Sequence, residues 1–521
     1  MSDFGKKSLS KKILASLPNF LFVLIIFIVA LALRFIQLGN TFISSDNVEL
    51  AQKIIVNKGY LWMIEENYGV LISFIVKVFV VSLSFLGVTV TEFWWKVPVA
   101  IIGSLQSVLV YIFLKKYLNV SKILAYFGAT MIAILPIHVM QSRYLWGYEV
   151  LAVFFITLAI WSLLIFLRKP TLSHGLWASL FNGLYLISHG YILPYVLCVL
   201  LIILIYSDNE RKINLKDILT RINLVFTKLV WIFPVLFLIF YANSLIHTFQ
   251  KNTNLGFYVF DHLPGFVANV GIVLFVLYIF SIILNLYLRK SIKKEGLLFV
   301  FFAFFYLAPF FFGVPPDITV ERGYMLMSAY FLLLSLVIIF DHYYLSHRKI
   351  IVMLMILGVS LTLWGTVESI FLKDVSFDPS LVKIERGSID DTGAKAAGYI
   401  TRKFISPEIK ILAVNKAIEP PVLDYYFKRA DGGYYDLSFE LYKEVFFTNK
   451  DNFDIIIVDK ETLPIVEADD TFIERIVLYS LHEPVMWIFA KQGVNIPEIK
   501  SDVLNYNKLY DKEFSPKISI Y

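Results

Sequence analysis

Cysteine is almost absent from the chain, because Cys198 is the only one among 521 residues. An internal disulfide framework and any site built from several cysteines, such as an iron–sulfur cluster, are therefore excluded. A Walker-type phosphate loop and a dinucleotide-binding glycine fingerprint are also missing. The sequence thus gives no signal for an ATP-driven pump or a soluble nucleotide-dependent enzyme.

Charge is also scarce. Charged residues make up 17% of the chain, hydrophobic residues make up 58%, and the mean hydropathy is +0.71. Soluble globular proteins contain about 25% charged residues and about 45–50% apolar ones. A soluble fold of this composition would lack polar surface, so the sequence predicts an integral membrane protein surrounded by membrane lipids.

The few charges are divided unevenly along the chain. Residues 1–370 hold 28 Lys and Arg against 16 Asp and Glu, whereas residues 371–521 hold 19 against 25. We therefore expect two domains: a basic transmembrane domain over 1–370 and an acidic soluble domain over 371–521. The basic excess lies in short loops without interleaved aromatic residues, which is typical of membrane orientation and not of nucleic-acid binding.

Apolar runs predict a polytopic α-helical membrane protein with about 11 transmembrane helices, since a spanning helix needs roughly 20 mostly apolar residues. The expected spans are about 19–38, 94–114, 122–139, 150–167, 174–188, 190–206, 226–246, 265–288, 297–313, 324–340 and 350–370. A further apolar run, 69–87, would reverse the side of every later basic loop if it crossed. We therefore expect it to be re-entrant or interfacial, in a multi-pass protein of the cell membrane whose N-terminus is cytoplasmic.

The C-terminal domain is then extracytoplasmic, and its pattern predicts a small α/β fold. Apolar periodicity predicts helices over Gly393–Phe404, Pro421–Arg429 and Asp469–Ser480. Runs rich in β-branched and aromatic residues predict strands over Lys410–Val414, Phe453–Asp459 and Met486–Ala490.

With this topology, the first outer loop begins just after the first span and carries Asp46. A carboxylate at the membrane rim is suited to take a proton from an acceptor hydroxyl, or to hold a divalent cation. Asp46 also suits an N-cap of the following helix, and the two roles are compatible.

The second outer tip, 138–149, carries Arg143 and Glu149. An arginine fork suits a phosphate, and a second acid suits sugar hydroxyls or a metal. The alternative is an Arg143–Glu149 ion pair at the interface. Arg322, which precedes a late span, and Arg34, near the end of the first, have the same two interpretations: phosphate ligand or interface anchor.

The sequence assigns no metal ligands. His189, His247, Asp261 and His262 lie near the outer face, and Glu65 or Glu66 would complete a set, but their spacing matches no metal motif. A divalent ion, Mg²⁺ or Mn²⁺, is left open as a cofactor, and His138 is expected to be structural.

The outer-face segments resemble the C-type-fold membrane glycosyltransferases, in particular the protein mannosyltransferase and aminoarabinose transferase superfamily. Asp46-Asn47 stands where those proteins show an Asp-Glu pair, and Lys96-Val97-Pro98 where they show Arg-Leu-Pro. The Arg143–Glu149 tip resembles their second outer-loop motif, and Arg322-Gly323-Tyr324 resembles their Arg-Tyr element. Their Lys-Pro-Pro element is absent, and Glu65-Glu66 lies in that region.

The resemblance implies an inverting glycosyltransferase that uses a polyprenyl-phosphate-linked sugar and an acceptor that is a glycan, lipid or protein. Asp46 would be the general base and Glu149 a second catalytic acid. Arg143, Arg322 and Arg34 would bind the leaving phosphate, with Tyr324, Glu65 and Glu66 as further substrate-binding residues.

Besides a non-catalytic assembly protein that retains the scaffold, two alternatives stay open. An oligosaccharyltransferase catalytic subunit shares the fold, but its tail carries a Trp-Trp-Asp motif where this chain has Gly433-Tyr434-Tyr435-Asp436. A lipid-linked glycan flippase is the other alternative. Transporters often carry ionisable residues near the bilayer midplane, whereas those of this chain cluster at the rim.

Overall fold

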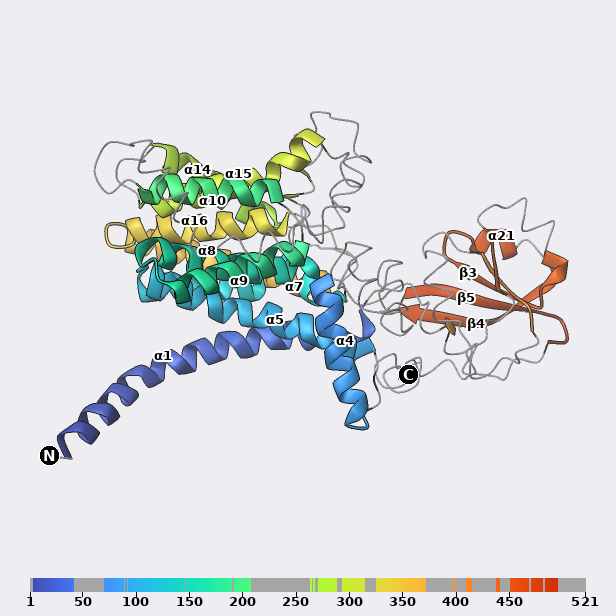
Figure 1. Cartoon of the computed structure of the whole chain (residues 1–521). Helices are drawn as coiled ribbons and strands as arrows, with labels where there is room; N and C mark the ends of the chain where they lie inside the picture. The colour runs from blue at the N-terminus through green and yellow to red at the C-terminus, as the bar shows by residue number, and fades with distance from the viewer. Residues whose placement is uncertain are drawn as a thin grey trace.

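The structure is a computed structural model that describes most of the membrane domain and a C-terminal sheet (Figure 1). The described residues are 3–41, 70–88, 90, 92–145, 147–189, 192–207, 263–264, 266–267, 270–287, 293–313, 325–371, 397–398, 409–414, 437–440, 450–467, 470–480 and 483–494. The predicted span 226–246 lies outside them, together with residues 42–69 of the first outer loop.

Helices occupy the other predicted spans and also the apolar run 69–87. They are α1 (Asp3–Phe35), η1 (Leu38–Asn40), α4 (Val70–Phe85), α5 (Glu92–Ile112), η2 (Phe113–Tyr117), α6 (Lys122–Ile134), α7 (Pro136–Ser142), α8 (Tyr148–Arg168), α9 (Leu172–His189), α10 (Ile192–Ser207), α14 (Ile272–Tyr287), α15 (Lys294–Gly313), α16 (Leu326–Tyr343) and α17 (Arg348–Phe371). Five described helices are long and apolar enough to cross a membrane, or six if α6 and α7 form one bent span. The chain is thus a multi-pass helical protein, and the count of about 11 spans stays a prediction.

The centre of the bundle is α16. Every side chain from Leu326 to Phe340 is buried, under cover from α6, α8, α14 and α15. By contrast, α1 and α17 expose large apolar side chains such as Phe20 and Met353. A buried centre with an apolar exterior is the arrangement that a lipid environment requires.

The apolar run 69–87 forms α4, which packs on α5, α8 and α9. Figure 1 shows α4 running across one end of the bundle and not along it. It is a single unbroken helix of 16 residues. This favours the interfacial alternative over a re-entrant loop.

Basic loops gather at the opposite end of the bundle. Asp341 at the end of α16 accepts hydrogen bonds from the Ser121 backbone N–H (2.8 Å) and from Lys293 Nζ (2.9 Å). The guanidinium of Arg168 lies 4.5 Å from the ring centre of Tyr117. These contacts place the loops before α6, after α8 and before α15 at one end, as the charge pattern predicts. The side of the membrane that this end faces stays a prediction.

The predicted span 122–139 is not continuous, which corrects the sequence-based expectation. It is broken into α6 and α7, whose axes differ by 53°. Pro136 begins α7; it has no N–H to donate to the Ile132 carbonyl, and its ring clashes with that carbonyl in an unbroken helix. The break leaves carbonyls at the end of α6 without helical partners, and these carbonyls reappear in the site described below.

The C-terminal residues form a five-stranded sheet in the order β2-β1-β3-β5-β4. The strands are β1 (Ile411–Val414), β2 (Leu437–Glu440), β3 (Ile455–Asp459), β4 (Phe472–Ser480) and β5 (Glu483–Lys491), with a short helix, α21 (Leu463–Glu467), after β3. β1 pairs in parallel with β2 and β3, and β5 pairs antiparallel with β3 and β4. Three predicted strands are confirmed, and the predicted helices 393–404 and 421–429 lie almost wholly outside the described residues.

The predicted helix Asp469–Ser480 is wrong, because Phe472–Ser480 is strand β4. The pairing of β4 with β5 shifts register between Glu474 and Ile476. A β-bulge of this kind interrupts the alternation of buried and exposed residues that identifies a strand. Buried Phe472 and Ile476 then stand four apart, a spacing that a helix also produces.

Gly103 lets α5 approach α1 and α7 closely. A β-carbon there would clash with the Ser142 side chain and lie 3.0 Å from Arg34 Nε. We expect Gly103→Ala to destabilise the protein by about 1–3 kcal/mol, the usual cost of overpacking. Thermal unfolding in detergent, followed by tryptophan fluorescence, measures the change.

The matched control is Gly358→Ala in α17, where the nearest atom to an added β-carbon is Leu277 Cδ1 at 3.7 Å. This variant should unfold at the wild-type temperature or slightly above it, because alanine favours helix over glycine by up to about 1 kcal/mol. Equal unfolding temperatures for Gly103→Ala and Gly358→Ala would contradict the close packing at Gly103.

Candidate active site

Buried charge distinguishes one end of the bundle from the other. Among the described residues of the membrane domain, the buried charged side chains are Arg34, Lys77, Glu92, Lys96, Arg143, Glu149 and Glu368. They come from the end of α1, from α4, from the starts of α5 and α8, from the residue after α7 and from the end of α17. The end of α1 and the starts of α5 and α8 lie at the end of the bundle that α4 crosses, away from the basic loops (Figure 1). The end of α17 lies there too, because it packs on α7 and Thr366 donates to the Ile134 carbonyl. We refer to this end as the outer end, after the side of the membrane that the charge pattern predicts for it.

Arg34 joins α1 to the break between α6 and α7. Its Nη1 donates to the carbonyls of Ala30 (3.0 Å) and Ala133 (2.9 Å), and its Nη2 donates to the Ile132 carbonyl at 3.5 Å. Ile132 and Ala133 are among the residues whose carbonyls the proline break releases. Thr366 of α17 donates to the next carbonyl, that of Ile134. The predicted phosphate role of Arg34 stays a prediction, and the described contacts show it holding a helix break together.

His138 receives the remaining contact of Arg34, with 2.7 Å between Arg34 Nη2 and His138 Nδ1. A guanidinium only donates, so Nδ1 accepts and the proton of the neutral ring sits on Nε2. This orientation supports the structural role expected for His138.

The Arg143 side chain caps the C-terminal end of α1. Its Nη1 donates to three carbonyls there: Leu33 at 2.9 Å, Arg34 at 3.3 Å and Ile36 at 2.7 Å. Burial lowers the pKa of Arg143 to about 9, so the guanidinium remains charged at neutral pH. Arg143 therefore brings a fixed positive charge to the point where the chain leaves α1.

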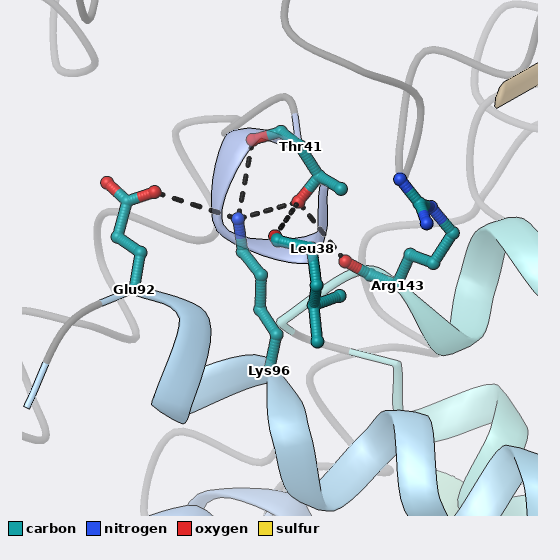
Figure 2. A network of polar contacts seen from close by, with 5 residues as sticks. All are labelled: Leu38, Thr41, Glu92, Lys96 and Arg143. Atoms are coloured by element: carbon teal, nitrogen blue, oxygen red, sulfur yellow. Dashed lines mark hydrogen bonds and ion pairs between the residues drawn. The ribbon is translucent and has the colours of Figure 1, made fainter. Parts of the chain in front are cut away.

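Lys96, one turn into α5, forms the second link to that point (Figure 2). Its Nζ lies 2.6 Å from Thr41 Oγ1 and 3.3 Å from the Thr41 carbonyl oxygen. Glu92, four residues earlier on the same helix, is 3.7 Å away through Oε2. Thr41 Oγ1 is also within hydrogen-bond distance of the Leu38 and Arg143 carbonyls, at 3.2 and 3.3 Å. One network thus joins α5, η1 and the corner after α7.

Glu149 lies in the first turn of α8 and is buried. A carboxylate in this position is favoured by the positive end of the helix dipole. The corner before it is tightly packed, because a β-carbon at Gly147 would clash with the Gln141 carbonyl and lie 2.7 Å from Val99 Cγ1. The structure brings Glu149 to the same end as Arg34 and Arg143.

The other predicted site residues lie outside the described residues: Asp46, Glu65, Glu66, Arg322 and Tyr324. The same holds for His247, Asp261 and His262, and for the side chain of His189. Within the described part of the chain, no three His, Cys, Asp or Glu side chains gather as metal ligands would. The positions of these residues stay predictions.

The sequence analysis assigned no site role to Thr41, Glu92 or Lys96, although Lys96 stands in the Lys96-Val97-Pro98 element of the resemblance. A Glu and a Lys four residues apart at the start of a helix are a common surface pair, so the spacing alone gave no reason to select them. Their burial is what sets them apart, and burial at an outer helix start is a signal that only the fold reveals.

No family model and no curated protein matches the chain. Solved structures that resemble it include an Archaeoglobus fulgidus oligosaccharyltransferase tethered with an acceptor peptide (13% identity, 92% of this chain and 74% of that one, TM-score 0.44). ArnT from Cupriavidus metallidurans is 11% identical, and the match covers 91% of this chain and 98% of ArnT with a TM-score of 0.47. AglB from Archaeoglobus fulgidus, in complex with an inhibitory peptide and a dolichol-phosphate, is 11% identical. The match covers 92% of this chain and 74% of AglB, with a TM-score of 0.44.

These neighbours are C-type-fold membrane glycosyltransferases, the superfamily that the sequence motifs resemble. Their identities and TM-scores lie below the level that establishes a common fold.

We expect Arg34→Met to destabilise the bundle strongly, because it leaves the carbonyls at the α6 break without donors. Each buried carbonyl left unpaired costs about 1–3 kcal/mol. Thermal unfolding in detergent should show a clear drop in midpoint. Arg348→Met, which removes an exposed arginine at the opposite end, is the control and should leave the midpoint unchanged. A wild-type midpoint for Arg34→Met would show that the carbonyl contacts contribute nothing.

Proposed function

We propose that the chain is an inverting glycosyltransferase that moves a sugar from a polyprenyl phosphate to an acceptor at the outer face of the membrane. The observation that carries this proposal is the confinement of buried charge to the outer end of the described bundle. Ionisable groups inside a membrane protein are costly and usually mark a functional site. Their position at one rim suits a reaction between a lipid-borne donor and an acceptor outside the bilayer.

Phosphate is the substrate group that this end suits best. The buried cations there are Arg34, Lys77, Lys96 and Arg143, and the buried carboxylates are Glu92, Glu149 and Glu368. Carbonyl contacts engage Nη1 of both Arg34 and Arg143, and backbone carbonyls do not cancel the charges of the guanidinium groups. In a site of low dielectric constant, such fixed positive charge stabilises an anion that forms in the transition state. A departing polyprenyl phosphate is an anion of that kind.

Asp46 is the residue that we propose as general base. Thr41 is held in the outer-end network, and Asp46 follows it by five residues. An extended chain of five residues spans at most about 17 Å, so Asp46 stays within reach of that end. It would accept the proton of the acceptor nucleophile as that atom bonds to the anomeric carbon and the phosphate leaves with the bonding electrons. Glu149 is proposed as the second catalytic residue. Arg322, Tyr324, Glu65 and Glu66 are proposed to bind the sugar and phosphate.

The described residues of the outer end do not fit Mg²⁺ or Mn²⁺ as a resident ion. They supply more buried cations than carboxylates, and no group of three ligating side chains is found among them. No step of the proposed reaction is therefore routed through a metal.

The test compares Asp46→Asn with the wild-type chain in proteoliposomes. A panel of polyprenyl-phosphate-linked hexoses and pentoses is added with an acceptor extract from the source cells, and released polyprenyl phosphate is measured. We expect Asp46→Asn to lower release by about 10²–10⁴-fold, the usual contribution of a general base. Asp451→Asn, which changes an exposed aspartate beside the C-terminal sheet, should release phosphate at the wild-type rate.

Full activity of Asp46→Asn would overturn the base assignment. Movement of intact lipid-linked sugar across the bilayer without release of polyprenyl phosphate would overturn the transferase proposal in favour of a flippase. Transfer of a whole oligosaccharide to asparagine of an acceptor peptide would identify an oligosaccharyltransferase.

A further inference from the structure

The Lys96 ammonium is completely buried, at the start of a helix in a largely apolar bundle. A buried ammonium is tolerated only when hydrogen bonds and opposite charge compensate it. Thr41 is the nearer partner, at 2.6 Å from Nζ, whereas Glu92 Oε2 lies 3.7 Å away. The shorter contact is thus to the chain that leaves α1 and not to the carboxylate on α5.

The Thr41 hydroxyl both accepts and donates hydrogen bonds. It has one proton, so while it accepts a hydrogen bond from Lys96 it donates to one of the two carbonyls within reach, Leu38 or Arg143. Donation to Leu38 closes the η1 turn, and donation to Arg143 ties that turn to the corner after α7. In both cases the Lys96 contact orients the hydroxyl. Figure 2 shows Lys96 reaching from α5 to Thr41, with the Arg143 carbonyl on the far side.

The residues on either side of η1 have contrasting backbone conformations. Gln37, which precedes η1, has a φ of 49°, and Thr41, which follows it, is extended with φ −75° and ψ 149°. A positive φ in a residue other than glycine persists only where surrounding contacts hold it. Thr41 precedes Asp46 by five residues. Among the hydrogen bonds of the Thr41 hydroxyl, the one from Lys96 is the shortest.

We propose that Lys96 is a positioning residue: through Thr41 it fixes the stem of the first outer loop and so directs Asp46 toward the reacting centre. This proposal rests on the function proposed above for Asp46. Lys96 itself need not touch substrate. A displacement of about 1 Å in a reacting group lowers the rate by about a hundredfold, so a small shift of the stem is enough to matter.

The first measurement concerns the loop and needs no activity. A nitroxide is attached at Ser44→Cys in the Cys198→Ala background, and its mobility is recorded by electron paramagnetic resonance in the full chain. Lys96→Met should broaden the range of label motion relative to the parent. Lys122→Met, which removes an exposed lysine at the opposite end, is the matched control and should leave the spectrum unchanged.

The second measurement separates positioning from substrate binding. Lys96→Met should lower kcat by about a hundredfold while the donor KM stays close to wild type. Thr41→Val keeps the shape of threonine but removes the hydroxyl, and should act in the same direction. Thr41→Ser restores the hydroxyl and should recover most of the rate. The double variant Lys96→Met, Thr41→Val should be no worse than the worse single variant, because both remove the same hydrogen bond.

The outcomes are distinct. An unchanged spectrum in Lys96→Met and in Thr41→Val overturns the positioning proposal, whatever the activity. A raised donor KM at unchanged kcat also overturns it, because that result would make Lys96 a donor-binding residue. If Lys96→Met alters the label motion but the wild-type chain transfers no sugar, the positioning contact is supported and the proposed function is overturned. If Lys96→Met fails to fold, the label motion and the kcat of Thr41→Val and Thr41→Ser test the positioning proposal instead.

Discussion

The outer end of this protein depends on how buried cations are accommodated inside an apolar bundle. A guanidinium or ammonium that leaves water loses its hydration, and hydrogen bonds together with partial compensation of the charge offset that cost. Arg34 and Arg143 use backbone carbonyls that have no helical partner, at the α6 break and at the end of α1. The cations and the helix ends therefore stabilise each other: the helix ends supply acceptors, and the cations satisfy carbonyls that would otherwise be buried unpaired.

This mutual dependence has a functional consequence. Backbone carbonyls are dipoles and not anions, so they hold the cations in place while leaving positive potential at the rim. A site that is already organised around positive charge needs little rearrangement when a phosphate leaves, and such preorganisation is a large part of enzymatic rate enhancement. Thr41, at the stem of the loop with the proposed base, is held by Lys96 and reaches the Arg143 carbonyl. Arg143 therefore takes part both in the cation–carbonyl contacts and in the contacts of that stem.

The sequence predicted the coarse arrangement well, because charge and hydropathy patterns are local. Basic loops marked one side, and this led to the conclusion that 69–87 does not cross, in agreement with the course of α4. Pro136 was visible in the sequence, yet the break that it causes was missed because the apolar run continues through it. In the C-terminal domain, the bulge after Glu474 gave β4 a spacing that resembles a helix.

The geometry of the site was not predictable from the sequence. Arg34 and Ala133 are 99 residues apart, and Lys96 and Thr41 are 55 apart. No local pattern reports such a contact. Arg143 and Arg34 were selected as arginines that suit phosphate, whereas their carbonyl contacts, and the burial of Lys96, follow only from the packing of α1, α5 and α7.

The central claim, sugar transfer at the outer face, is tested most directly by mass spectrometry of surface glycans. Glycans on proteins, lipids and cell-wall polymers are compared between the source cells, cells that lack this chain, and cells in which it is restored. The account predicts that one sugar disappears from one class of surface glycan and returns on restoration. A glycan profile that is identical in all three cell lines would contradict it.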